Sequence, residues 1–88
     1  MDILILDSAY KHGITEESIL FCIYNYRNDK TLNDPPLKRL FVGFDHLGNA
    51  IEVIAIEEED ANHGSSKRLV VIHAMKLQKK YFYLLRSN

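Results

Sequence analysis

The 88-residue chain is 47% hydrophobic and 26% charged, which excludes a disordered chain and leaves room for one domain over residues 1–88. Its net charge of -1 excludes a general electrostatic attraction to nucleic acid, although no acidic residue follows Lys67 and the C-terminal quarter is basic. The single cysteine, Cys22, excludes an internal disulfide, and no apolar run approaches the roughly 20 residues of a membrane span. These features predict a cytoplasmic protein.

The first part of the chain predicts a short strand and a short helix. Residues 2–6 form an apolar run that is typical of a strand. Asp7 or Ser8 can cap a helix over residues 9–12, because either side chain can accept from a free N–H of the first turn. Gly13 suits the left-handed position that ends such a helix.

A second helix is expected to begin after Thr15 and to reach about Tyr26. Thr15 is a good N-cap residue, two glutamates follow it, and apolar residues then recur at helical spacing. The polar residues 27–30 end this pattern. Residues 33–36 contain two prolines and are expected to form a loop.

The second half of the chain predicts three antiparallel strands and a last helix. The strands are expected over residues 38–44, 50–56 and 68–73, with a polar loop over 57–67 and a helix over 75–86. The second of these strands is apolar except for one glutamate, which predicts a central position buried on both faces. The fold class predicted is α+β, with a small antiparallel sheet of three to four strands, two N-terminal helices and a C-terminal helix.

Metal-dependent and covalent catalysis find little support in the sequence. The histidines are scattered and lie at positions His12, His46, His63 and His73. Cys22 has no CxxC partner and falls on an apolar helix face, where a thiol is usually part of the core. The four glycines match no phosphate-binding loop. No metal and no cofactor are therefore expected.

Histidine, lysine, arginine and tyrosine near the predicted sheet and last helix have the chemistry for metal-independent RNA cleavage. Such cleavage needs a base for the 2′-hydroxyl, cations for the charge that builds on phosphorus, and an acid for the leaving oxygen. The candidate catalytic residues are His73, Lys76 and Arg39. Candidate RNA-binding residues, which supply cations or stacking rings, are Lys11, Lys79, Lys80, Tyr81 and Tyr83. The plain alternative is a partly buried histidine with surface lysines and core tyrosines, and composition alone favours it.

Four short motifs follow one another along the chain. They are Lys11-His12-Gly13-Ile14 before a Glu-rich helix start, Arg39-Leu40-Phe41-Val42-Gly43, a glycine-containing hairpin, and Ile72-His73-Ala74-Met75-Lys76 before a tyrosine-containing segment. Their order and spacing resemble the BrnT-like toxins, which are small bacterial proteins of type II toxin–antitoxin systems related in fold to the RelE ribonucleases. The resemblance covers most of the chain.

The resemblance implies an α+β fold around a small antiparallel sheet, a metal-independent endoribonuclease, and neutralisation by a DNA-binding antitoxin. By position, His12 matches the histidine of the family's KHG motif, and Arg39 matches a basic residue that enters the first meander strand. Lys76 matches the lysine that follows the family's Ser-Ala-Arg, and Tyr81 or Tyr83 matches its late tyrosine.

One motif departs from the family pattern. Where the family has Ser-Ala-Arg-Lys, this chain has His-Ala-Met-Lys, so Met75 stands where an arginine is expected to stabilise phosphate charge. Two hypotheses follow. In the first, the chain is a toxin-like endoribonuclease with His73 or His12 as the general base and with Arg39 and Lys76 as the stabilising cations. In the second, it is a non-catalytic toxin-like module of the same fold that binds a protein. The partners considered are an antitoxin, RNA and a second copy of the chain, with no membrane.

Overall fold

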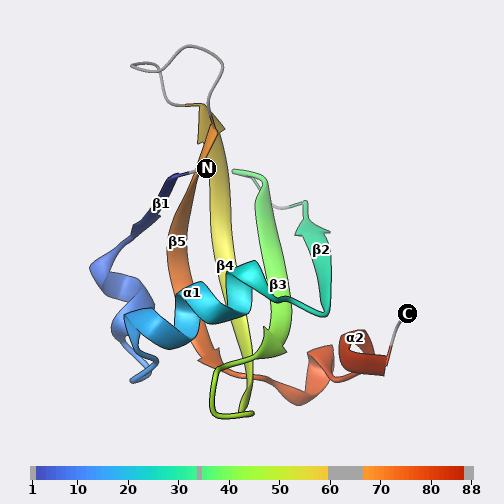
Figure 1. Cartoon of the computed structure of the whole chain (residues 1–88). Coiled ribbons are helices and arrows are strands. Elements are labelled where there is room, and N and C mark those ends of the chain that lie inside the picture. Colours follow the sequence, from blue (N-terminus) through green and yellow to red (C-terminus); the bar gives the residue numbers. More distant parts are fainter. Residues whose placement is uncertain (1, 34, 60–66, 87–88) are drawn as a thin grey trace.

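The computed structural model of the protein describes residues 2–33, 35–59 and 67–86 (Figure 1). The strands in this part of the chain are β1 (Asp2–Ile5), β2 (Asn28–Leu32), β3 (Lys38–Phe44), β4 (Ala50–Glu59) and β5 (Lys67–Lys76). The helical segments are the 3-10 turns η1 (Asp7–Tyr10) and η3 (Lys79–Tyr81), and the α-helices α1 (Glu16–Tyr24) and α2 (Tyr83–Arg86). The Cα radius of gyration is 12.7 Å, close to the roughly 12 Å expected of a compact domain of this length.

Within the described residues, the five strands form one mixed sheet in the order β1-β5-β4-β3-β2. The outer strand β1 runs parallel to β5, and every other neighbouring pair is antiparallel. The predicted fold class, an antiparallel sheet of three to four strands with two N-terminal helices and a C-terminal helix, is therefore wrong. The sheet is larger and mixed, and the first of the two predicted N-terminal helices is a single 3-10 turn.

Strand β2 is the element that the sequence pattern did not predict. Its residues are polar, and polar residues have low strand propensity when judged alone. It pairs with β3 at the edge of the sheet, where its outer side faces solvent and charged side chains are favoured. Asp29 of β2 forms an ion pair with Arg39 of β3, so pairing with a neighbour defines this strand more than its own pattern does.

Strand β5 extends beyond the predicted boundary and replaces the start of the last helix. His73, Ala74 and Met75 pair with β4, and Lys76 pairs with Ile51. A β-bulge interrupts this pairing, because Ile54 lies opposite His73 while Ala55 lies opposite Val71. The residues left after Lys76 form two short segments, η3 and α2, in place of one long helix.

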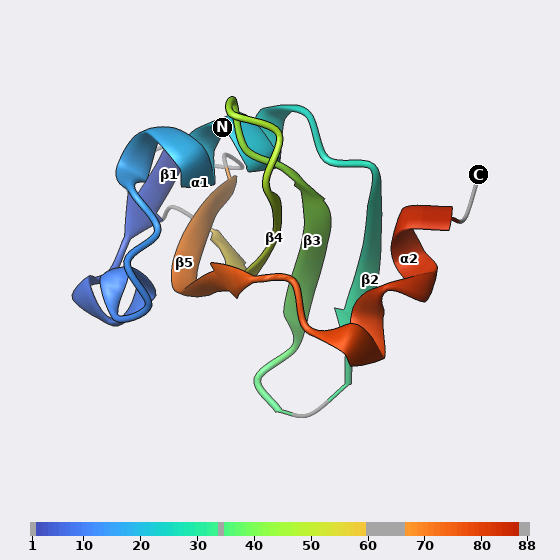
Figure 2. The ribbon, with the colours of Figure 1, turned by 90° about the horizontal axis from the view of Figure 1, so that it is seen from below.

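The two faces of the sheet are covered by different parts of the chain (Figure 2). Helix α1 packs on one face, where its Ile19 and Cys22 join Phe41, Val53 and other apolar residues in the larger core cluster. On the opposite face, Leu77 and Leu84 of the C-terminal segment pack on β3 in a second cluster. The central strand β4 is therefore buried on both faces along most of its first half, as its apolar pattern predicts.

Several local predictions are confirmed by the structure. The hydroxyl of Thr15 accepts a hydrogen bond from the Ser18 N–H and caps α1. Gly43, which the sequence offers as a place for close backbone approach in the strand over 38–44, lies against the chain that leaves α1, since a Cβ at this position would be 3.2 Å from the Tyr26 Cα. The predicted cap of the first helix is wrong, because no side chain caps η1 and the Ser8 hydroxyl donates instead to the Ile72 carbonyl oxygen at 2.9 Å.

The buried thiol of Cys22 should be unreactive in the folded protein. Burial, with a smaller contribution from Asp45, raises its pKa from 9.0 to about 12. About three pKa units lower the thiolate fraction near neutral pH by roughly 10³-fold, and the thiolate is the reacting species. We expect iodoacetamide to label the native protein about 10³-fold more slowly than the urea-unfolded protein, as measured by intact mass. Similar labelling rates for the native and the unfolded protein would show that the face of α1 that carries Cys22 is not packed against the sheet.

Candidate functional site

The carboxyl group of Glu52 is the most deeply buried charged group on the sheet face that the C-terminal segment covers. Glu52 lies on the central strand β4 with an exposed fraction of 0%. Its Oε1 accepts from the Gln78 backbone N–H at 2.9 Å, and its Oε2 accepts from the Gln78 side-chain amide at 2.8 Å. The His73 Nε2 lies 3.1 Å from the same Oε2. A carboxylate this deeply buried is stabilised by such hydrogen bonds, which take the place of water.

His73 is half-buried and is held by Glu52 at one ring nitrogen. With Glu52 accepting as a carboxylate, the His73 Nε2 carries the proton and donates it in the hydrogen bond. The Nδ1 atom is then the unprotonated nitrogen of the neutral ring. The network thus fixes the orientation of one imidazole, and with an ionised Glu52 it selects the tautomer that carries the proton on Nε2, which is the role a buried carboxylate plays behind a catalytic histidine.

A second imidazole, that of His12, lies edge-on against His73. The two ring centroids are 5.5 Å apart and the ring planes are inclined by 72°. Strand β1 ends with Ile5 opposite Val71 of β5. The turn η1 follows and lies beside the next residues of β5, where the Ser8 hydroxyl donates a hydrogen bond to the Ile72 carbonyl oxygen. Gly13, with a φ of 81°, turns the chain after this point. His12 is exposed, so one member of the pair is open to solvent and the other is anchored.

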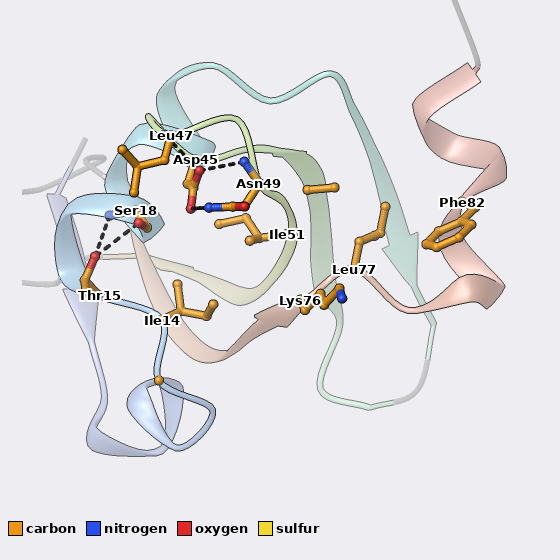
Figure 3. Close-up of a pocket in the computed structure, with 12 residues that line it drawn as sticks. Ile14, Thr15, Ser18, Asp45, Leu47, Asn49, Ile51, Lys76, Leu77 and Phe82 are labelled. Atoms are coloured by element: carbon orange, nitrogen blue, oxygen red, sulfur yellow. Dashed lines mark hydrogen bonds between the residues drawn. The ribbon is translucent and has the colours of Figure 1, made fainter.

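Lys76 does not point toward His73. Strand residues alternate between faces, so Lys76 shares a face with Ala74 and not with His73. Ala74 belongs to the core beneath α1. Lys76 lines a cavity of about 500 Å³ on that side of the sheet, together with Ile14 and Ser18 (Figure 3). The lysine and the imidazole pair therefore sit at the same end of β5 but on opposite faces.

Arg39 lies away from both groups. It pairs with Ala55 across the sheet, four residues along β4 from the Lys76 partner Ile51, or roughly 13 Å at the rise of a strand. Its guanidinium forms an ion pair with Asp29, and this hydrogen bond raises the pKa of Arg39. It also lies 4.8 Å above the Phe41 ring. These contacts explain Arg39 as a structural residue that links β2 to β3.

The predicted RNA-binding residues are spread over two places. Lys11 is exposed next to His12. Lys79 and Lys80 are exposed on η3. The Tyr81 ring packs against the second core cluster, with the Lys80 ammonium 5.1 Å from its centroid. The Tyr83 hydroxyl accepts from the Lys30 ammonium at 3.0 Å, which raises the pKa of Lys30.

Sequence reasoning missed the two residues that organise the site, Glu52 and Gln78. The signal for Glu52 was visible, because it is the only charged residue in the apolar run from Ala50 to Ile56. A charge in a strand expected to be buried on both faces needs partners. Gln78 carried no comparable signal, since it belonged to the helix that the sequence predicted and that the structure replaces with an extended segment.

Other candidate chemistry is not assembled in the described part of the chain. No group of three or more His, Cys, Asp or Glu residues among the described positions could hold a metal ion. His46 lies in the hairpin between β3 and β4, near Glu17, and His63 falls outside the described residues. In residues 2–33, 35–59 and 67–86, no helix has the length and apolar character needed to cross a bilayer.

Asp45 stabilises the hairpin beside the cavity and should make stability depend on acid pH. Burial by itself would raise its pKa, but hydrogen bonds from the Asn49 backbone and side chain and from the Leu47 N–H together lower it below 3.8. A lowered folded-state pKa adds stability above the unfolded pKa of about 4, and this stability is lost as pH falls through the folded value. We expect the difference in unfolding free energy between wild type and Asp45→Asn to shrink from pH 6 to pH 2 in urea titrations. A constant difference would contradict the assignment.

The chain was compared with protein-family models, curated proteins and solved structures, and no match was found in any of the three comparisons. The arrangement of His12, His73 and Glu52 is the feature of the structure that bears most directly on function.

Proposed function

We propose that the protein is a metal-independent endoribonuclease that cleaves RNA at the His12–His73 pair. The contact between the two imidazoles, one of them anchored by the buried Glu52, is the observation that supports this function most directly. Two imidazoles can serve as general base and general acid, since an imidazole can both accept and donate a proton. RNA suits such a pair because the substrate brings its own nucleophile, the 2′-hydroxyl.

The proposed reaction is an internal transesterification. A neutral imidazole takes the proton of the 2′-hydroxyl, and the oxygen forms a bond to phosphorus. The bond from phosphorus to the 5′-oxygen breaks, and the other imidazole, in its protonated form, gives its proton to that oxygen. The products are a 2′,3′-cyclic phosphate and a 5′-hydroxyl, with one proton taken up and one released by the protein. His73 Nδ1 is the base in this assignment, because Glu52 holds the Nε2 proton.

Two cations at this end of the sheet support binding of a phosphodiester. Lys11 precedes His12 and is exposed. Lys76 ends β5 on the face opposite His73, and its ammonium has no hydrogen-bond or ion-pair partner among the described residues. Met75 is uncharged and lies on β5 opposite Glu52, so it cannot replace a phosphate-binding arginine. Arg39 has no catalytic role in the proposal, because its contacts are with Asp29 and Phe41.

The biological role proposed is that of the toxin in a type II toxin–antitoxin pair, with a small antitoxin as the protein partner. The sequence resemblance supports this role, since the histidine of its KHG motif is one of the two imidazoles in contact. A second candidate function, protein binding without catalysis, is favoured by the exposed rings of α1. Phe21 and Tyr24 are 39% and 71% exposed on that helix.

The test uses the purified protein with a short RNA that carries a label at each end. We expect cleavage that continues in excess EDTA, with a 2′,3′-cyclic phosphate on one fragment and a 5′-hydroxyl on the other. The same sequence made of DNA, or of 2′-O-methyl RNA, should not be cleaved, because the nucleophile is missing. Fragments ending in 3′-hydroxyl and 5′-phosphate would rule out the transesterification. Intact RNA would favour the binding function.

A further inference from the structure

A cavity of about 500 Å³ lies at the end of the sheet, on the face opposite His73 and beside the Gly13–Ile14 segment that follows His12, and the proposed reaction does not use it. Ile14 and Ser18 lie on one side of it, the β3–β4 hairpin borders it, and Lys76, Leu77 and Phe82 lie on the other side (Figure 3). Its volume falls within the range of small-molecule sites. Most of the lining is apolar, with a few polar groups that can fix the orientation of a ligand.

The polar groups of the cavity differ in how many hydrogen bonds they already form within the protein. The Asp45 carboxylate accepts three hydrogen bonds from the hairpin and is committed there. The Ser18 hydroxyl accepts from Thr15 and keeps its own proton to donate. The Lys76 ammonium has no hydrogen-bond or ion-pair partner among the described residues. The cavity thus offers one cation and one hydroxyl donor beside apolar walls.

Phe82 supplies an aromatic wall that the sequence reading did not consider. Its side chain lines the cavity while the residue remains 42% exposed, and Leu47 on the hairpin rim is 74% exposed. Exposed apolar side chains around a cavity mark a binding site more often than scattered ones do. A ring beside a lysine suits a flat aromatic group that carries a phosphate, because bases stack on aromatic side chains and lysine pairs with phosphate.

Residues that line the cavity follow both members of the imidazole pair closely along the chain. Gly13 and Ile14 of its lining directly follow His12, and the Cα of Lys76 lies roughly 10 Å from the Cα of His73 at the rise of a strand, with the two side chains on opposite faces. This span is on the scale of one nucleotide. We propose that the cavity binds a base of the RNA substrate adjacent to the cleaved phosphodiester, with the base stacked on Phe82 and a neighbouring phosphate on Lys76. This inference rests on the proposed function for its choice of ligand.

The test measures binding in the absence of cleavage. The His12→Ala/His73→Ala double variant is titrated separately with AMP, GMP, CMP and UMP, and its backbone amides are followed by NMR. We expect the largest shifts at Ile14, Ser18 and Leu77, with one base preferred. Inorganic phosphate at the same concentration should shift the region of Lys76 without shifting Ile14.

Matched variants separate the cavity from general surface binding. In the same background, Phe82→Ala should weaken nucleotide binding roughly 5- to 150-fold, the range expected for loss of one stacking platform. Lys76→Ala should weaken it as well. Tyr24→Ala and Lys67→Ala remove an exposed ring and an exposed cation outside the cavity and should change the affinity less than twofold.

The possible results distinguish the two proposals. Cavity shifts in the double variant, together with no cleavage by the wild type, would support the nucleotide site and overturn the ribonuclease. Cleavage by the wild type without cavity shifts, or equal affinity in Phe82→Ala, would overturn the cavity assignment and leave the ribonuclease intact. Shifts of the same amides by a protein partner but not by nucleotides would overturn the base site in favour of a peptide site.

Discussion

Replacement of His73 by alanine is expected to lower the rate of RNA cleavage by about 10²–10⁴-fold while the protein stays folded. A positioned general acid or base contributes a factor of this size, and His73 is the imidazole that Glu52 orients. His12→Ala is expected to lower the rate by a similar factor, because the reaction needs both proton transfers. The double variant should be little worse than either single variant, since residues that act as a unit are not additive. The measurement is initial cleavage rate of an end-labelled RNA in EDTA.

His46→Ala is the matched control for these variants. His46 is an exposed histidine in the β3–β4 hairpin and lies 3.8 Å from the Glu17 carboxylate, outside the imidazole pair. Its removal should leave the cleavage rate within twofold of wild type, and circular dichroism should show the same fold in every variant. An equal loss of activity in His46→Ala, or full activity in His73→Ala, would remove the imidazole pair from the mechanism.

The motifs that contain His12 and His73 could be identified in the sequence, but the contact between these two residues could not be predicted from it. Gly13 was predicted to end a short helix and does turn the chain with a positive φ, and His73 was predicted at the end of a strand. The contact between His12 and His73 depends on the parallel pairing of β1 with β5. Parallel pairing of the first and last strands is a long-range choice that no local pattern encodes.

The positions of the cations were misjudged for a related reason. Lys76 was expected beside His73 because both residues lie at the predicted junction between the last strand and the last helix. In the strand that forms instead, residues three apart point to opposite faces, so Lys76 meets the cavity and His73 meets Glu52. Arg39 was expected to contact the phosphate. In the structure it forms an ion pair with Asp29 of β2, a strand that was not predicted because its residues are polar. Two errors in element assignment, one at the end of β5 and one at β2, thus changed the expected surroundings of two candidate residues.

Replacement of Glu52 by alanine is expected to destabilise the protein by about 3–5 kcal/mol. The change leaves the Gln78 N–H, the Gln78 amide and the His73 Nε2–H without their acceptor, at the place of a side chain that is itself 0% exposed. Hydrogen bonds to a charged group contribute about 1.5–3 kcal/mol each, and they are not additive. A domain of this size has a total stability of about 5–15 kcal/mol, so the loss is a large part of it. Urea unfolding followed by circular dichroism measures the effect.

Glu58→Ala is the matched control on the same strand. Glu58 is also a β4 glutamate, but its side chain is 42% exposed and it pairs with Arg68 at the surface. A surface ion pair contributes about 0–1 kcal/mol, so this variant should remain close to wild type in stability. Equal losses in Glu52→Ala and Glu58→Ala would show that the Glu52 network contributes no more than a surface pair.

Glu52→Gln separates the positioning of His73 from the stability of the fold. Glutamine fills the same space and can still accept from the Gln78 N–H, so the loss of stability should be smaller than in Glu52→Ala. Its amide group would face the His73 Nε2 as a donor, which favours the tautomer with the proton on Nδ1. Long-range ¹H–¹⁵N spectra of the imidazole should show this change of tautomer, and cleavage should fall because Nδ1 can no longer act as the base. A folded Glu52→Gln protein with an unchanged His73 tautomer and full activity would mean that Glu52 holds the C-terminal segment to the sheet and has no role in catalysis.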